Sequence, residues 1–248
     1  MRVLAIIPAR YGSTRFPGKP LADLAGKPMI QRVFEQVITC TSVSDVIVAT
    51  DHADIFSVVQ SFGGRVIMTS ESCLSGTDRC AEVLEKIQDD FDLMLNVQGD
   101  EPFIQCGQIE ELIESMALPE AQIGTLVRRI GQTEDLFNPN VVKAAFSASG
   151  RALYFSRNPI PFVRGAEKDE WLEKAVFFRH IGLYAYRPTV LREIAKLPGG
   201  KLEMAESLEQ LRWMEAGYPV FVRETAFDSP GIDTPEDLET ALLRYNSN

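Results

Sequence analysis

Basic side chains and glycines are concentrated near the N-terminus, in the segment IIPARYGSTRFPGKPL that runs from Ile6 to Leu21. Arg10, Arg15 and Lys19 supply three cations there, and nearby glycines leave backbone amides accessible. Several donors gathered in one loop suit the oxygens of a triphosphate. The alternative is a solvated loop with incidental positive charge. Because the loop directly follows an apolar run, we favour the phosphate-binding interpretation.

Two common phosphate-binding motifs do not describe this loop. A Walker A loop has four residues between its glycines and a Ser or Thr after its lysine. Here five residues separate Gly12 from Gly18, and Pro20 follows Lys19. The G-x-G-x-x-G pattern of dinucleotide-binding folds is also absent from the loop. The sequence therefore indicates a phosphate site that is neither an ATPase P-loop nor a dinucleotide site.

Two acidic motifs could supply a metal site. Asp100 lies in NVQGDEP, directly after an apolar run, and Asp233 lies in GIDTPEDL. Magnesium is held by one or two carboxylates together with phosphate oxygens and water. Each motif also has a purely structural interpretation, because Gly-Asp-Glu-Pro suits a β-turn and either Asp233 or Thr234 could cap a helix.

Three further segments carry polar side chains whose role the sequence leaves open. SGTDR, from Ser75 to Arg79, could contact a nucleotide base or could only cap a helix. His180, Tyr184 and Tyr186 would share one face of a strand, which suits a sugar acid but is also typical of the wetter face of a sheet. In SLEQL, spacing alone predicts that Glu209 and Gln210 are solvated.

The elements that must position these residues alternate along the first half of the chain. Strands are predicted at residues 3–7, 43–51, 65–68 and 92–97, with helices at 27–40, 52–64 and 75–88 between them. This rhythm predicts an α/β fold with a mostly parallel sheet, and ligands bind at the carboxyl ends of such strands. From about Gly124, strands at 125–130, 180–187 and 219–224, a hairpin turning at Ser149-Gly150 and a helix at 202–217 predict a smaller lobe. A final helix should follow Asp233.

Composition excludes several classes of protein. The chain has 248 residues, is 45% hydrophobic and carries a formal net charge of −10. An acidic chain is a poor binder of nucleic acid or of anionic lipid, so we expect neither partner. We also expect no membrane span, no secretory leader and a cytoplasmic location. The four cysteines form no C-x-x-C pair, which predicts free thiols.

Taken together and in order, these motifs resemble one family. IIPARYGSTRFPGKPL, SGTDR, NVQGDEP, ALYFSRNPIP, RHIGLYAYRP, LEQLR and GIDTPEDL follow the pattern of the 3-deoxy-manno-octulosonate cytidylyltransferases, or CMP-Kdo synthetases. The resemblance runs from the first strand to the last helix. It implies a Rossmann-like (GT-A-like) nucleotidyltransferase domain over residues 1–248, in which residues 124–230 contribute the sugar-binding and dimerisation lobe. It also implies a homodimer that uses Mg²⁺, CTP and Kdo to form CMP-Kdo and pyrophosphate for lipopolysaccharide assembly.

The same resemblance implies roles for individual residues. Catalysis would rest on Arg15, Lys19, Asp100 and Asp233, and Mg²⁺ would bind Asp100 and Asp233. CTP would contact Pro8, Ala9, Arg10, Ser13, Arg15, Lys19, Ser75, Gly76, Thr77, Arg79, Gln98 and Asp100. Kdo would contact Arg157, His180, Tyr184, Glu209, Gln210 and Asp233.

Three other functions fit part of the pattern. The same chemistry could act on another acidic sugar, such as sialic acid or an amino analogue of Kdo. A glycosyltransferase on a related sheet would release a nucleoside phosphate instead of pyrophosphate. A nucleotide sensor would bind CTP without consuming it, and the pair Asp100 and Asp233 makes this the weakest of the three.

Overall fold

The computed structural model describes residues 1–12 and 16–246, and it divides into two compact units. The first unit comprises residues 1–110, 187–195 and 228–248, and the second comprises residues 111–186 and 196–227. The chain therefore leaves the first unit and returns to it twice. The assignment of residues 124–230 to a sugar-binding and dimerisation lobe stays a prediction.

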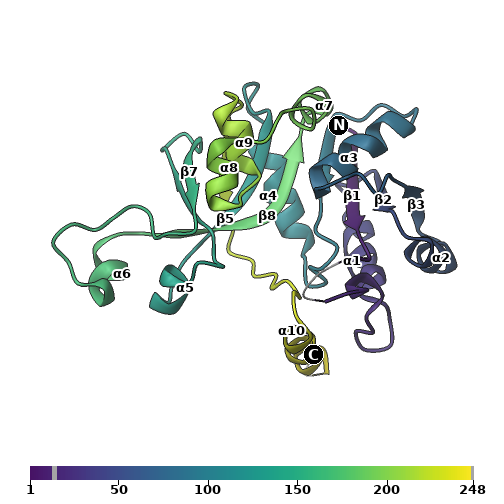
Figure 1. Cartoon of the computed structure of the whole chain (residues 1–248), viewed down its shortest axis with the longest axis horizontal. Coiled ribbons are helices and arrows are strands. Elements are labelled where there is room, and N and C mark those ends of the chain that lie inside the picture. Colours follow the sequence, from purple (N-terminus) through teal and green to yellow (C-terminus); the bar gives the residue numbers. More distant parts are fainter. Residues whose placement is uncertain (13–15, 247–248) are drawn as a thin grey trace. The chain divides into compact units, whose positions relative to one another are not determined.

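A parallel sheet forms the centre of the first unit (Figure 1). β1 pairs with β2 on one side and β4 on the other, and β3 pairs with β2, all in parallel. The helices α1, α2 and α3 pack against these strands. The elements of this unit are β1 (Val3–Ala9), η1 (Lys19–Leu21), α1 (Met29–Ile38), β2 (Asp45–Thr50), α2 (Ala53–Ser61), β3 (Arg65–Met68), α3 (Gly76–Lys86), β4 (Leu93–Asn96), the start of α4 (Cys106–Ser115), α7 (Pro188–Ile194) and α10 (Pro235–Asn246).

The strand register brings the predicted polar motifs to one edge. Ala9 is the partner of Thr50 in β2, and Ile6 is the partner of Asn96 in β4. The loops that follow β1, β2 and β4 therefore leave the same end of the sheet. This confirms the predicted α/β fold with a mostly parallel sheet, in which β1, β2 and β4 are almost fully buried and the edge strand β3 is partly exposed.

Antiparallel pairing dominates the second unit. β5 pairs with β8, and the hairpin of β6 and β7 turns at Gly150, whose φ of 81° suits glycine. β9 runs parallel to β5. The elements are β5 (Ile123–Arg129), α5 (Thr133–Phe137), β6 (Lys143–Phe146), β7 (Ala152–Ser156), η2 (Lys168–Glu170), α6 (Trp171–Lys174), β8 (Phe178–Tyr186), α8 (Lys201–Glu206), α9 (Gln210–Glu215) and β9 (Val220–Glu224).

Several helices differ from the sequence prediction. The single helix expected at 202–217 is divided into α8 and α9, because Ser207 adopts a left-handed conformation with φ 52°. The sequence prediction also missed α4, α5, α6 and α7. No helix within residues 1–12 and 16–246 is long and apolar enough to cross a membrane.

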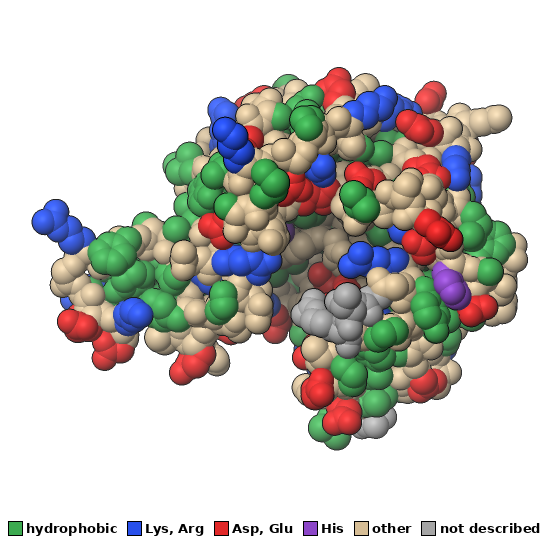
Figure 2. All heavy atoms as spheres, viewed as in Figure 1, with side chains coloured by type: hydrophobic (Ala, Val, Ile, Leu, Met, Phe, Trp, Pro, Cys, Tyr) green, Lys and Arg blue, Asp and Glu red, His purple; other side chains and the backbone are tan. Residues whose placement is uncertain are grey.

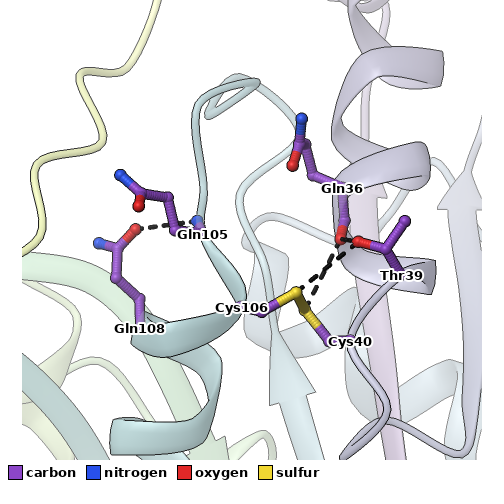
Figure 3. Close-up of a disulfide and its surroundings, with 6 residues drawn as sticks. All are labelled: Gln36, Thr39, Cys40, Gln105, Cys106 and Gln108. Atoms are coloured by element: carbon purple, nitrogen blue, oxygen red, sulfur yellow. Dashed lines mark hydrogen bonds between the residues drawn. A yellow bond between two sulfur atoms is a disulfide. The ribbon is translucent and has the colours of Figure 1, made fainter.

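Cys40 and Cys106 form a disulfide, which corrects the expectation of four free thiols (Figure 3). Cys40 follows the end of α1, and Cys106 is the first residue of α4. The pairing was not visible in the sequence because 66 residues separate the two cysteines. Cys73 and Cys80 take part in no disulfide.

Candidate active site

A cavity of about 290 Å³ lies at the carboxyl edge of the sheet in the first unit. Its lining comes from the loops after β1 and β4, from the start of α3 and from the segment before α10. The lining residues are Pro8, Ala9, Arg10, Lys19, Pro20, Cys73, Leu74, Ser75, Gly76, Arg79, Gln98, Gly99, Asp100 and Asp233. Motifs that are far apart in the sequence therefore meet in one place.

Lys19 lies between the two predicted metal-binding carboxylates. Its Nζ donates to Asp100 Oδ2 at 2.5 Å and to Asp233 Oδ1 at 3.1 Å. The lysine side chain is only 13% exposed, so solvent screens these contacts weakly. Both carboxylates therefore point at one position, and the Lys19 ammonium group occupies it.

The backbone holds the two acidic segments together. The Ile232 amide donates to the Asp100 carbonyl at 2.9 Å, one residue before Asp233. The loop after β4 in turn lies against β1, because a Cβ at Gly99 would be 2.8 Å from the Pro8 carbonyl oxygen. Only glycine allows that approach without a shift of the backbone. Asp100 is therefore fixed relative to β1 by the residue before it.

The structure separates metal binding from helix capping at the start of α10. Thr234 Oγ1 accepts from the Asp237 amide, and Asp237 Oδ2 accepts from the amides of Asp233 and Thr234. This is a reciprocal capping arrangement. Thr234 is therefore the cap, and the Asp233 carboxylate contacts Lys19 instead.

At the start of α3, the two interpretations of SGTDR both have support. Ser75 Oγ accepts from the Asp78 amide, and Asp78 Oδ2 accepts from the Ser75 amide, so Ser75 caps the helix. Ser75 and Gly76 nevertheless line the cavity. The buried Arg79 donates to Asp51 and to Thr69, which accounts for part of its hydrogen-bonding capacity.

Most of the predicted nucleotide-contacting residues meet at this cavity. Pro8, Ala9, Arg10, Lys19, Ser75, Gly76, Arg79, Gln98 and Asp100 all line it. Thr77 is buried and lies outside the lining. Ser13 and Arg15 lie outside the described residues, so their predicted roles stay predictions. Sequence reasoning missed Cys73 and Leu74, which directly precede the predicted Ser75.

Cys73 is held in its thiol form. Burial and the hydrogen bond from its Sγ to Glu82 Oε2 raise the pKa of Cys73 to about 12. The thiolate is the nucleophilic form of cysteine, so this side chain is a poor nucleophile at neutral pH. The cavity therefore offers charge neutralisation and no activated thiol.

The predicted sugar-contacting residues lie in the second unit, apart from Asp233. His180 and Tyr184 are both on β8, with ring centroids 5.2 Å apart. Burial lowers the pKa of His180 to about 3. Burial, and secondarily the charge of Glu209, raise the pKa of Tyr184. Both side chains are therefore neutral near pH 7.

Tyr184 has an unusual environment. Its hydroxyl is buried and has no hydrogen-bond partner among the described residues, although its ring packs edge-on against Trp213 at 5.2 Å. A buried hydroxyl without a partner costs free energy, which marks this position as one that a ligand could satisfy.

The remaining predicted sugar contacts are partly engaged by the protein itself. Arg157 donates to the carbonyls of Pro139, Glu206 and Ser207, and so it holds the left-handed turn between α8 and α9. Glu209 accepts from Arg212 at 2.8 Å. Gln210 is buried, so the expectation from spacing that it is solvated is wrong. It is the first residue of α9, directly after the break between the two short helices that the sequence did not indicate.

Comparison with known proteins gives a consistent result. The cytidylyltransferase family model matches residues 4–225. A 3-deoxy-manno-octulosonate cytidylyltransferase from Parabacteroides distasonis is 52% identical over 98% of this chain and 97% of its own length. One from Cytophaga hutchinsonii is 51% identical over 95% of this chain and 94% of its own. A solved structure of CMP:2-keto-3-deoxy-manno-octonic acid synthetase complexed with CTP is 43% identical, with a TM-score of 0.92 over 100% of this chain and 99% of that one.

These relatives cover 95% to 100% of the chain, and the family model spans the loop after β1, the acidic loop after β4 and the strand β8. The resemblance read from the motifs is thereby confirmed. The chain belongs to the cytidylyltransferase family and, within it, to the 3-deoxy-manno-octulosonate cytidylyltransferases.

Proposed function

We propose that the protein transfers CMP from CTP to 3-deoxy-manno-octulosonate (Kdo), forming CMP-Kdo and pyrophosphate. The observation that carries the proposal is the convergence of Asp100, Asp233 and Lys19 on a cavity lined by the basic loop after β1. Family membership supplies the substrates, since relatives of the same length carry the name of this activity.

In the reaction the C2 hydroxyl oxygen of Kdo bonds to the α-phosphorus of CTP. The bond from that phosphorus to the bridging oxygen breaks, pyrophosphate leaves, and the hydroxyl proton passes to solvent. Arg10 and Lys19 line the cavity and can neutralise phosphate charge there. Such transfers depend on positioning and on charge stabilisation more than on covalent participation by the protein. The protonated Cys73 fits a mechanism without a covalent enzyme intermediate.

A magnesium ion fits the donor set of the cavity. Among residues 1–12 and 16–246, no three His, Cys, Asp or Glu side chains cluster as metal ligands. Asp100 and Asp233 supply two carboxylates, which is the number that magnesium takes when substrate phosphates complete its shell. The ion would lower the charge repulsion at the phosphates and the pKa of a bound hydroxyl. Lys19 would then leave the carboxylates for the phosphate oxygens.

We infer that Kdo contacts the side chains of the second unit. Tyr184 is a neutral phenol whose hydroxyl has no hydrogen-bond partner among the described residues, so it can donate to a sugar oxygen. Arg157 uses three carbonyls as acceptors, and its remaining N–H groups can reach a carboxylate. Glu209 and Gln210 would bind the sugar hydroxyls.

A homodimer working in the cytoplasm for lipopolysaccharide assembly belongs to the same proposal. It rests on the resemblance of the motifs to the family. The second unit also carries exposed apolar side chains among charged ones, which Figure 2 shows around α6. Leu153, Phe162 and Val176 are 62%, 75% and 47% exposed, and a dimer contact would cover such side chains. Light scattering of the purified protein should give twice the monomer mass.

The test of the activity is pyrophosphate release with purified protein, CTP, Mg²⁺ and Kdo, with each component omitted in turn. Release that needs all components supports the proposal. Release only with sialic acid or an amino analogue of Kdo would retain cytidylyl transfer and reject the Kdo assignment. CTP binding without release under any condition would reject the reaction and indicate a sensor.

A further inference from the structure

Thr125 on β5 contacts the predicted sugar-binding histidine. Its side chain is completely buried. Its Oγ1 lies 3.0 Å from His180 Nε2, 3.0 Å from the Ile181 carbonyl oxygen and 2.8 Å from the Leu183 carbonyl oxygen. The pairing of β5 with β8 shifts at this point, since Thr125 is opposite Tyr184 whereas Leu126 is opposite Ile181. At this irregularity two carbonyl groups of β8, those of Ile181 and Leu183, face the Thr125 hydroxyl.

The number of protons available at the Thr125 hydroxyl indicates which nitrogen of the His180 ring is protonated. A threonine hydroxyl has one proton to donate, and carbonyl oxygens can only accept. If that proton were given to His180 Nε2, both carbonyls would face lone pairs of Oγ1 at hydrogen-bond distance. If Nε2 carries a proton and donates to Oγ1, the hydroxyl proton remains for the carbonyls. The second arrangement avoids the repulsion, so the ring is protonated at Nε2.

The other ring nitrogen, Nδ1, then carries a lone pair and no proton. Burial keeps His180 neutral, so Nδ1 is an acceptor near pH 7. The groups packed around the ring are aromatic: Phe155 is edge-on at 5.1 Å and Tyr184 is at 5.2 Å. A neutral acceptor can bind a hydroxyl but repels a carboxylate oxygen.

We propose that Thr125 is a positioning residue that fixes His180 as the Nε2–H tautomer, so that Nδ1 accepts a hydrogen bond from a hydroxyl of the sugar acid. The inference rests on the proposed function, because it assumes that the sugar lies against β8. It also assigns different parts of the sugar acid to different side chains. His180 recognises a hydroxyl, and the sugar carboxylate must be bound by a cationic side chain such as Arg157.

The chain is well suited to a direct test because it has only two histidines, His52 and His180. Long-range ¹H–¹⁵N spectra of the full chain without substrate distinguish the two neutral tautomers. His52→Asn assigns the two rings. We expect the Nε2–H pattern for His180 from pH 5.5 to 8.5. An Nδ1–H pattern in the unmodified protein overturns the proposal, whatever the activity proves to be.

Variants test the positioning role. Thr125→Val removes the hydroxyl with little change of shape, and Thr125→Ser retains it. We expect Thr125→Val to lose the single tautomer and to raise KM for Kdo about 5- to 10-fold, as for one lost hydrogen bond, while KM for CTP stays within about 2-fold. Thr125→Ser should restore both readouts. Equal KM values for Kdo in Thr125→Val and the parent, with the tautomer unchanged, overturn the proposal.

The two proposals fail in different ways. If the protein forms no CMP-Kdo but His180 shows the Nε2–H pattern that Thr125→Val disturbs, the proposed function is wrong and the positioning role stands for another ligand. If CMP-Kdo forms and the tautomer is Nδ1–H, the proposed function stands and the role of Thr125 is wrong. Should Thr125→Val fail to fold, the tautomer of the unmodified protein and of Thr125→Ser still decides.

Discussion

At the scale of single residues, the most informative feature is that Lys19 neutralises the two carboxylates that are proposed to hold magnesium. With Nζ at 2.5 and 3.1 Å from Asp100 and Asp233, the lysine would compete with the proposed metal ion for one position. A bound nucleotide would end that competition by offering phosphate oxygens to both cations. The arrangement explains how the carboxylates are held close together before substrates bind.

This competition predicts the behaviour of Lys19→Met. Removing the ammonium takes away the cation that lies between the two carboxylates, so magnesium should bind the nucleotide-free variant at least about 10-fold more tightly than the parent. Turnover should nevertheless fall about 100-fold or more, because a donor to the phosphates is lost. Titration calorimetry and pyrophosphate release measure the two effects. Weaker magnesium binding in the variant would contradict the competition.

Asp100→Asn tests the metal assignment itself. The amide keeps the size of the side chain but loses its charge, so turnover at saturating CTP and fixed magnesium should be abolished. Glu239→Gln is the matched control, because Glu239 is exposed on α10 and its change removes the same charge away from the cavity. Near-normal turnover of Asp100→Asn would contradict the proposal that Asp100 binds magnesium.

His180 also predicts how stability depends on pH. Its pKa is about 3 in the folded protein and about 6.5 when unfolded, so the unfolded chain binds the extra proton between these values. Its contribution is therefore fully present above pH 6.5 and is lost as the pH falls toward 3, by up to about 1.4 kcal/mol per pH unit. Urea unfolding of His180→Asn should show a shallower decline over that range. A slope in His180→Asn equal to that of the parent would contradict this prediction.

At the scale of elements, the sequence predicted those strands, helix starts and turns that depend on interactions between neighbouring residues. The apolar run of β1, the helix start at Ser75 and the turn at Gly150 were all visible, because each depends on a few neighbouring residues. The break at Ser207 was not, since carbonyls held by Arg157 from 50 residues away stabilise it. The burial of Gln210 was not predicted either, because it depends on packing within the second unit and not on helical spacing.

The loop after β4 gives a test at this scale. In Gly99→Ala the new Cβ would lie 2.8 Å from the Pro8 carbonyl oxygen, and backbone cannot easily give way. We expect a loss of about 1–3 kcal/mol in the free energy of unfolding and a displaced Asp100, hence reduced turnover. Gly131→Ala is the control, because nothing lies within 4 Å of its Cβ position. Equal stability of the two variants would contradict the tight approach.

At the scale of the whole molecule, the sequence did not reveal which residues that are far apart in the chain contact one another. The motifs predicted the sheet and the acidic pair, since their order along the chain matches one family. They could not predict that Thr125 contacts His180, or that Cys40 bonds Cys106, because such contacts depend on how strands and helices are brought together. The sequence thus indicated the candidate catalytic and binding residues more fully than the residues that position their side chains.

The disulfide gives the last prediction, because it acts on the unfolded chain as a whole. Closing a loop of 66 residues restricts the unfolded ensemble, so breaking the bond should cost about 2–4 kcal/mol of unfolding free energy. Adding a reductant to the parent should therefore lower its urea midpoint. The double variant Cys40→Ala and Cys106→Ala is the control, since its midpoint should not respond to reductant. A thiol assay on the denatured, unreduced parent should find only Cys73 and Cys80. Four reactive thiols there would show that the protein carries no such bond, and the start of α4, which follows the loop that bears Asp100, would then not be tied covalently to the end of α1.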